Sequence, residues 1–188
     1  MVVVPFVAAE LAGCGDDGKE PSAGGTRSAS IVRAGDADEG IDGVQAFRVE
    51  SNEHTDAEVD YAVLPPPGGL HNDVWANCGF YDVGIDDEHI VHDLEHGAVW
   101  LAYSLDLAAA QVEVIHDLAR AHDKVIATPY PGLPVGTAVV ASAWARQLVL
   151  DTVVDPRLER FVVQYQDGSQ APEAGVTCTG SPLGDPIP

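Results

Sequence analysis

Histidine and glutamate residues that could bind a metal ion lie close together in the middle of the chain. His92, Glu95 and His96 form the pattern H-x-x-E-H, and residues three and four apart are neighbours on a helix surface. Neutral imidazole is the commonest protein ligand for zinc, copper and iron, and a carboxylate adds an anionic donor. A further donor must come from elsewhere, and His71 is the nearest candidate. The spacing therefore indicates a transition-metal site in which Glu95 is a ligand or orients one.

The same pattern leaves two other functions open. In one class of metallopeptidase, H-x-x-E-H supplies two zinc ligands and a general base, which here would be Glu95. The chain would then be a small zinc hydrolase, although 188 residues are few for a peptidase of that kind. The histidines could instead form hydrogen bonds within the polar core of a structural or partner-binding module. His54, in a loop before an expected strand, could close over the site from another direction.

The residue types available elsewhere bear on which metal ion such a site would hold. Met1 is the single methionine, so a copper(I) carrier built on thioether ligands fits poorly. A histidine-rich site suits copper(II) or zinc better. The remaining histidines are weaker candidates for ligands. His116 and His122 are expected to face solvent on or beside a long helix, and His89 shares the helical face of His92.

Acidic residues dominate the charge of the chain. Thirty Asp and Glu residues against nine Lys and Arg residues give a formal net charge of -21 at pH 7. Such a surface repels the phosphates of nucleic acids and the headgroups of anionic lipids. Nucleic acid is therefore not an expected partner, and the glycine-rich phosphate loops and the G-x-S-x-G nucleophile motif are lacking.

The first residues have the features of a targeting segment. A short apolar run ends in Leu11-Ala12-Gly13-Cys14, the form of a bacterial lipobox, whose cysteine becomes acylated. A buried N-terminal strand is the alternative, but the polar stretch 15–40 is more typical of a flexible tether. We therefore expect residues 1–14 to be a lipoprotein signal segment. The protein would be extracytoplasmic and anchored to the outer face of the cell membrane through Cys14.

Two further cysteines, Cys78 and Cys178, have two alternative roles. In an oxidising compartment outside the cytoplasm they are most simply paired as a disulfide. The bond would tie the C-terminal tail to the middle of the chain. The competing role is that of a soft thiolate ligand for copper or zinc.

Hydrophobic periodicity predicts a single α+β domain. Apolar runs predict strands at 44–49, 59–63, 98–103, 125–128, 137–144 and 147–150. Helical spacing predicts helices at about 86–97, at 105–122 with Asp106 as the cap, and at 155–166 with Pro156 in the first turn. We expect a globular domain at 41–180 with a mixed or antiparallel sheet and two or three packed helices, followed by a tail at 181–188.

Two of these segments must position the candidate ligands. Leu64-Pro65-Pro66-Pro67-Gly68-Gly69 excludes regular structure, because proline removes backbone donors and glycine permits close approach. His71 is therefore expected on a constrained loop. The helix that starts near residue 86 would carry His92 and His96 on one side while its apolar residues face the core.

Five segments together resemble a known family. They read PPGGLH at 66–71, WANCGFY at 75–81, VHDLEHGAVW at 91–100, PYPGLP at 129–134 and PEAGVTC at 172–178. This resembles an actinobacterial envelope family catalogued as domain of unknown function 3105, over roughly residues 54–180. The resemblance implies that the residues shared with the family pattern are His54, His71, Cys78, His92, Glu95, His96 and Cys178. Members look like secreted or lipid-anchored proteins found beside copper-handling envelope proteins, which favours copper over zinc as the bound ion.

Overall fold

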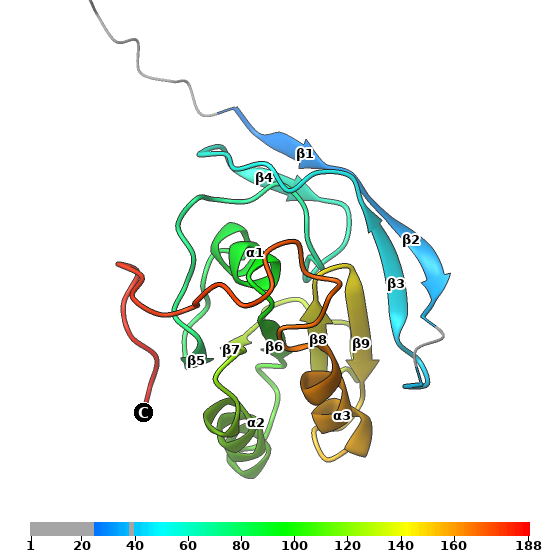
Figure 1. The fold of residues 1–188 in the computed structure, drawn as a ribbon. Coiled ribbons are helices and arrows are strands. Elements are labelled where there is room, and N and C mark those ends of the chain that lie inside the picture. The colour runs from blue at the N-terminus through cyan, green and yellow to red at the C-terminus, as the bar shows by residue number, and fades with distance from the viewer. Residues whose placement is uncertain (1–24, 38–39) are drawn as a thin grey trace, which may run out of the picture.

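The structure, a computed structural model, describes residues 25–37 and 40–188 (Figure 1). The expected lipobox, with Cys14, lies outside the described residues. The described part has an α+β architecture, as predicted. Its helices are α1 (Asp87–Glu95), α2 (Ala109–Ala121) and α3 (Pro156–Tyr165), and none of them is long and apolar enough to cross a bilayer. Its strands are β1 (Arg27–Ala29), β2 (Ile31–Asp36), β3 (Gln45–Val49), β4 (Val59–Tyr61), β5 (Gly79–Phe80), β6 (Val99–Tyr103), β7 (Val125–Pro129), β8 (Val139–Ala143) and β9 (Arg146–Leu150).

Seven strands form one mixed sheet in the order β2-β3-β9-β8-β6-β7-β5. β6 and β7 are parallel and are connected through helix α2, whereas β8 and β9 are antiparallel neighbours. β5 adds a short parallel edge beside β7. β1 and β4 form a separate parallel pair. The prediction of a mixed sheet with packed helices is therefore confirmed.

Strand β6, which lies between β8 and β7, is buried on both faces and separates two hydrophobic cores. Leu101 and Tyr103 belong to the core that α2 and α3 cover, whereas Trp100 and Ala102 belong to the core that α1 and the β1–β4 pair cover (Figure 1). This division follows from the alternation of side chains along a strand. α1 is thus held between the sheet and the N-terminal strands, and its residues 90–95 are all buried.

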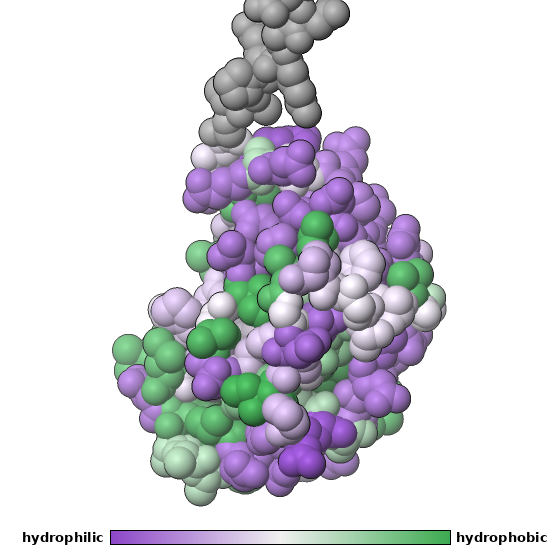
Figure 2. All heavy atoms as spheres, turned by 90° about the vertical axis from the view of Figure 1, so that its left-hand side faces the viewer, coloured by the Kyte–Doolittle hydropathy of each residue, from purple (hydrophilic) through white to green (hydrophobic). Residues whose placement is uncertain are grey.

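After α3 the described chain has no further helix or strand and passes beside α1 on its way to β5. The backbone N–H of Glu173 donates to the carbonyl oxygen of Glu95 at 3.0 Å, and that of Ile187 donates to Phe80 at 2.8 Å. Figure 2 shows this side of the molecule. Hydrophilic residues gather toward the end that carries β1, and hydrophobic ones are more frequent toward the opposite end.

The structure differs from the predictions at two places. The stretch 15–40, expected as a tether, contains β1 and β2, in which Ala29 and Ile31 are buried. Most other side chains of these strands face solvent, so their sequence has the polar composition of a tether. Helix α2 begins at Ala109, and its N-cap is Ala108, whose N–H donates to Oε1 of Gln111 at 3.1 Å. Asp106 is therefore not the cap.

Candidate metal centre

Helix α1 carries three of the candidate ligands on one side. Glu95 is three residues from His92, and His96, the C-cap, is four residues from it. The helix stops because Gly97 has a φ of 90°, a conformation that side chains disfavour. A Cβ atom at Gly97 would also lie 3.0 Å from the backbone of Asp167. The end of the helix, and with it the position of His96, is thereby fixed.

A buried loop between β4 and β5 brings His71 to helix α1. Gly69 has a φ of 127°, and a Cβ atom there would lie 3.1 Å from Ala29 and 3.4 Å from Tyr61. Glycine therefore lets the loop pack closely against β1 and β4. The hydroxyl of Tyr61 donates to the carbonyl oxygen of Leu70 at 2.6 Å. The next residue, His71, is fully buried on a constrained loop, as its proline and glycine neighbours predicted.

A backbone bridge joins His54 to the same loop. The N–H of Thr55 donates to His71 at 2.7 Å, and the N–H of His71 donates to Glu53 at 3.2 Å. The ring of His54 stacks on that of His92, with centroids 4.9 Å apart and an interplanar angle of 27°. The His54 side chain is 50% exposed, so the cluster reaches the protein surface at this residue.

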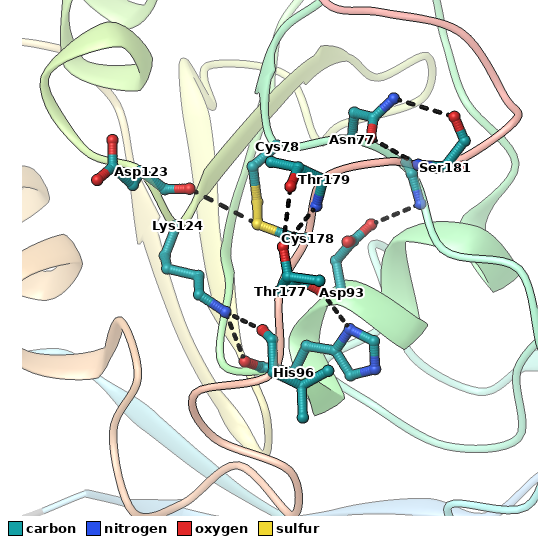
Figure 3. The surroundings of a disulfide bond; sticks show 12 residues. Asn77, Cys78, Asp93, His96, Asp123, Lys124, Thr177, Cys178, Thr179 and Ser181 are labelled. Carbon is teal, nitrogen blue, oxygen red and sulfur yellow. Dashed lines mark hydrogen bonds between the residues drawn. A yellow bond between two sulfur atoms is a disulfide. The ribbon is translucent and has the colours of Figure 1, made fainter.

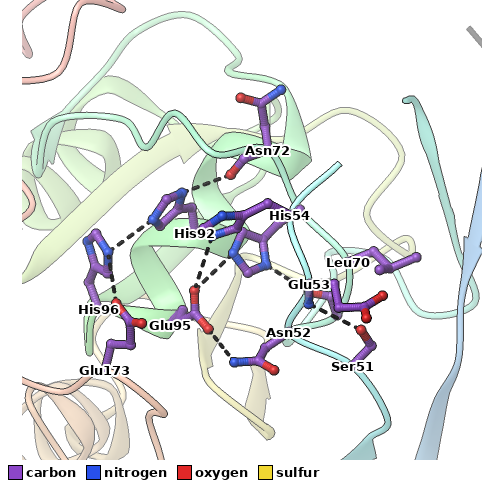
Figure 4. A network of polar contacts seen from close by, with 12 residues as sticks. Ser51, Asn52, Glu53, His54, Leu70, Asn72, His92, Glu95, His96 and Glu173 are labelled. Carbon is purple, nitrogen blue, oxygen red and sulfur yellow. Dashed lines mark hydrogen bonds and ion pairs between the residues drawn. The ribbon is translucent and has the colours of Figure 1, made fainter. Parts of the chain in front are cut away.

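Four side chains from three segments converge between the loop and helix α1. One imidazole nitrogen each from His54, His71 and His92 and a carboxylate oxygen of Glu95 all lie within 4.8 Å of one another. Oε2 of Glu95 is 3.0 Å from Nε2 of His71. The same oxygen is 3.7 Å from Nε2 of His54, and Figure 4 shows these two side chains together. Nitrogen and oxygen ligands of one zinc ion lie about 3 to 4 Å apart, because each bond is about 2.0–2.2 Å long. The contacts of Glu95 with His71 and His54 lie in this range, and small side-chain rotations would bring the whole group to such separations.

Hydrogen bonds to the backbone determine where three of the rings carry their hydrogen. In each ring Nδ1 donates to a carbonyl oxygen: His71 to Gly69 at 2.8 Å, His92 to Asn72 at 2.8 Å and His96 to Thr177 at 3.0 Å. A carbonyl oxygen only accepts, so each neutral ring keeps its hydrogen on Nδ1 and has a lone pair on Nε2. Histidines that bind metals commonly donate their other ring nitrogen to a carbonyl in this way.

Two close contacts consequently bring acceptors together without a hydrogen atom between them. Nε2 of His71 lies 3.0 Å from the Glu95 carboxylate but has no hydrogen-bond partner among the described residues. The Nε2 atoms of His92 and His96 are 3.0 Å apart, and neither neutral ring has a hydrogen to share. An extra proton or a metal ion relieves either contact. Burial, together with the neighbouring imidazoles, lowers the pKa of His92 to about 4 and so opposes the extra proton.

Asn52 orients the carboxylate of Glu95. Its Nδ2 donates to Oε1 of Glu95 at 2.7 Å, and this leaves Oε2 facing His71 and His54. Burial raises the pKa of Glu95, whereas a cation on Nε2 of His71, either a proton or a metal ion, and the hydrogen bond from Asn52 lower it below its usual value. The carboxylate is therefore ionised at neutral pH and supplies the anionic donor of the cluster.

The candidate ligands occupy a central group and one neighbouring position. His71, His92 and Glu95 converge, and His54 is the fourth member of the group. His96 lies beside His92 but outside this group, and its Nε2 is 3.8 Å from a carboxylate oxygen of the exposed Glu173 (Figure 4). His96 can therefore extend the site but does not lie at its centre.

Three other histidines lie away from this group. His116, expected to face solvent, packs its ring on Phe80 with centroids 4.6 Å apart, and its side chain is only 14% exposed. His122 follows α2 and lines a cavity beside the disulfide. His89 makes a hydrogen bond with the carbonyl oxygen of Val74. None of the three is a member of the four-residue group.

Cys78 and Cys178 form a disulfide, as the pairing hypothesis predicted (Figure 3). The bond joins residues 100 positions apart and ties the tail after α3 to the segment before β5. A backbone hydrogen bond of 2.7 Å from the N–H of Cys78 to the carbonyl oxygen of Cys178 accompanies it. In this paired state neither cysteine is a thiolate ligand of the histidine cluster.

Several groups that support the cluster carry no signal in the sequence. The carbonyl oxygens of Gly69 and Asn72 belong to the backbone, so no residue type marks them. Asn52 lies 43 positions from Glu95 and in a loop. Trp75 lies on the constrained loop, and its ring centroid is 5.7 Å from that of His92. The loop thus contributes a ligand, two orienting carbonyl groups and an aromatic cover.

Comparison with known proteins identifies a family. The profile described as a protein of unknown function, DUF3105, matches residues 53–180, a span that includes all four residues of the cluster and both paired cysteines. No curated protein and no solved structure matches the chain. Because the matched span covers more than half of the sequence, the protein belongs to the DUF3105 family.

Proposed function

We propose that this protein binds a transition-metal ion through His54, His71, His92 and Glu95, with His96 as an additional ligand beside them. One observation supports this function above the others. The Nδ1 atoms of His71 and His92 are used by backbone carbonyls, so the Nε2 lone pair of His71 faces the Glu95 carboxylate and that of His92 faces Nε2 of His96. A single cation satisfies all of these acceptors, whereas a purely structural polar core would pair each acceptor with a donor.

Copper is the favoured ion and zinc the second. The donor set contains three imidazole nitrogens and a carboxylate oxygen, which both copper(II) and zinc accept. At a site of this type the intrinsic affinity for copper(II) exceeds that for zinc. Thioether and thiolate groups would favour copper(I), but the single methionine is Met1, and Cys78 and Cys178 are bonded to each other.

The environment of Glu95 fits metal binding better than hydrolysis. A general base in a zinc hydrolase must be free to take a proton from metal-bound water. Here Asn52 donates to Oε1, and Oε2 faces His71 and His54. The carboxylate is thus part of the donor set, and we propose a metal-binding protein in preference to a zinc hydrolase.

Calorimetric titration with copper(II) tests this function. The unmodified protein should bind one equivalent, and the His71→Ala, His92→Ala double variant should lose at least about a hundredfold in affinity, since even outer-sphere partners contribute about 10- to 100-fold. His122→Ala removes a histidine outside the cluster and should leave the affinity unchanged. Circular dichroism shows whether each variant is folded. Equal affinities of a folded double variant and the unmodified protein would refute the proposal.

We also propose that the protein is held outside the cytoplasmic membrane through an acylated Cys14. The lipobox pattern at 11–14 supports this location, and a disulfide is typical of proteins outside the reducing cytosol. Cys14→Ala should move the protein from the membrane fraction to the soluble fraction of expressing cells. Unchanged fractionation would contradict the anchor.

A further inference from the structure

A second group of metal-binding residue types lies next to helix α1, away from the histidines. The sulfur atoms of Cys78 and Cys178 and a carboxylate oxygen of Asp93 all lie within 4.8 Å of one another. Figure 3 shows Asp93 on the helix beside the disulfide. α1 therefore presents His92 and Glu95 to the histidine cluster and Asp93 to the two sulfurs.

Asp93 is fully buried, and one of its oxygens has no partner. Oδ2 accepts a hydrogen bond of 3.0 Å from the N–H of Ala76. Oδ1 has no hydrogen-bond partner in the part of the chain that the structure describes. An unpaired polar atom in a protein interior is costly and needs a reason. The sulfurs of an intact disulfide carry neither a hydrogen nor a charge that could satisfy this oxygen.

We propose that reduction of the Cys78–Cys178 disulfide creates a second metal site, for a borderline-soft divalent cation of the zinc type, with both thiolates and Asp93 as ligands. Thiolates and a carboxylate are a donor set that zinc accepts. The reductant is a dithiol, which forms its own disulfide and transfers two electrons and two protons to the two sulfurs. The cation then displaces the two thiol protons together with the proton that burial favours on the Asp93 carboxyl. This site shares no ligand with the histidine cluster and extends beyond the proposed function.

The surroundings of the disulfide allow this change. Two sulfurs bound to one zinc ion are about 3.8 Å apart, because each zinc–sulfur bond is about 2.3 Å long. Cys178 lies in the irregular tail after α3, so its sulfur can move away from Cys78 without breaking a helix or strand. A cavity of about 670 Å³ is lined by both cysteines together with Lys124 and Pro186. Through this cavity the reductant and the cation can reach the sulfurs.

Titration with cadmium, a spectroscopic substitute for zinc, tests the proposal. Thiolate–cadmium bonds absorb in the ultraviolet by charge transfer, so this signal reports sulfur ligands alone. Protein reduced with a phosphine should develop the absorption and saturate at one equivalent, whereas the same chain with its disulfide intact should show none. Asp93→Asn retains an acceptor for Ala76 but loses the anionic ligand, and its cadmium affinity should fall about tenfold or more. Asp82→Asn, at an exposed acidic residue, is the matched control and should bind as the unmodified protein does.

The same titration on a variant of the histidine cluster distinguishes the two sites. The His71→Ala, His92→Ala variant should keep the charge-transfer signal when reduced, even though it loses copper at the first site. A reduced protein without the signal would overturn the proposal. So would loss of helical circular dichroism on reduction, because the site requires a folded α1, and so would equal affinities of Asp93→Asn and the unmodified protein.

Discussion

Nε2 of His71 lies 3.0 Å from Oε2 of Glu95, and this contact joins a proline-rich loop to helix α1. Both residues are buried, and the hydrogen of the neutral His71 ring is used by the carbonyl oxygen of Gly69. The contact therefore places a nitrogen lone pair against a carboxylate, an arrangement that a cation stabilises. The loop is in consequence part of the donor set and not only a cover for the helix.

The orienting role of Asn52 can be tested by removing its side-chain amide. Asn52→Ala should lower the affinity for copper(II) by about tenfold, because outer partners of a ligand contribute about 10- to 100-fold. Loss of the 2.7 Å hydrogen bond lets the Glu95 carboxylate rotate, but the number of bound ions should stay at one. Competition titration against a chelator of known affinity measures both quantities. An unchanged affinity would mean that Glu95 does not depend on Asn52.

Trp75 provides a local reporter of the site. Its ring centroid lies 5.7 Å from that of His92 and 5.6 Å from that of His96. Copper(II) quenches nearby tryptophan fluorescence, so emission should fall until one equivalent has been added and then remain constant. Trp75→Phe should reduce this quenching while binding the same amount of copper, and the remaining quenching should come from Trp144, whose ring centroid is 6.2 Å from that of His71. Quenching that continues well beyond one equivalent would indicate adsorption to the acidic surface instead.

The pKa of Asp87, in the first turn of α1, predicts a pH dependence of the free energy of unfolding that is separate from the metal site. Tyr130 donates to its Oδ2 at 2.9 Å, but burial dominates and raises its pKa from 3.8 to about 6. Between these two values the native state binds more protons than the unfolded state, so this group favours folding as the pH falls and opposes it at pH 7. Asp87→Asn should therefore raise the free energy of unfolding at pH 7, by at most about 3 kcal/mol, since each pKa unit corresponds to about 1.4 kcal/mol.

The same variant should lose this advantage in acid. Below about pH 3, which is lower than both pKa values, the carboxyl of Asp87 is protonated in both states, so the two proteins should have similar free energies of unfolding. Urea unfolding at pH 7 and in acid measures the difference. A stabilisation that grows as the pH falls would contradict the assignment of a raised pKa to Asp87.

The main strands and helices could be predicted from the sequence, because buried elements need a recognisable pattern of apolar residues. β6 to β9 are apolar enough to be recognised without alternation, and α3 begins at Pro156, where a missing N–H costs nothing. β1 and β2 could not be recognised, because they bury only Ala29 and Ile31. The order of the strands depends on contacts between distant segments, which a local pattern does not contain.

The ligands on helix α1 could also be predicted from the sequence. For the ligands on loops, the sequence indicates candidate residues but not their positions. A spacing of three and four residues is enough to bring Glu95 and His96 beside His92. Prolines and glycines indicated a constrained loop for His71 but not its direction. The position of His54 in the group depends on its backbone bridge to His71. Such a bridge has no periodic signature, so the sequence favours His96 over His54 as a ligand.

The disulfide should contribute strongly to stability. It closes a sequence separation of 100 residues, and constraint of the unfolded chain over such a loop is worth about 3 to 5 kcal/mol. Reduction should therefore lower the urea midpoint of unfolding without altering the helical circular dichroism in the absence of urea. The Cys78→Ala, Cys178→Ala variant should match the reduced protein. Equal midpoints for oxidised and reduced protein would show that the bond does not constrain the unfolded chain in this way.

Anomalous X-ray diffraction from crystals grown with one equivalent of copper(II) tests the central claim most directly. Data collected on both sides of the copper absorption edge should give one strong difference peak, bounded by Nε2 of His71, Nε2 of His92 and Oε2 of Glu95. The peak should be absent from crystals of a folded His71→Ala, His92→Ala variant. A peak located only among surface carboxylates, or none in the unmodified protein, would contradict the account.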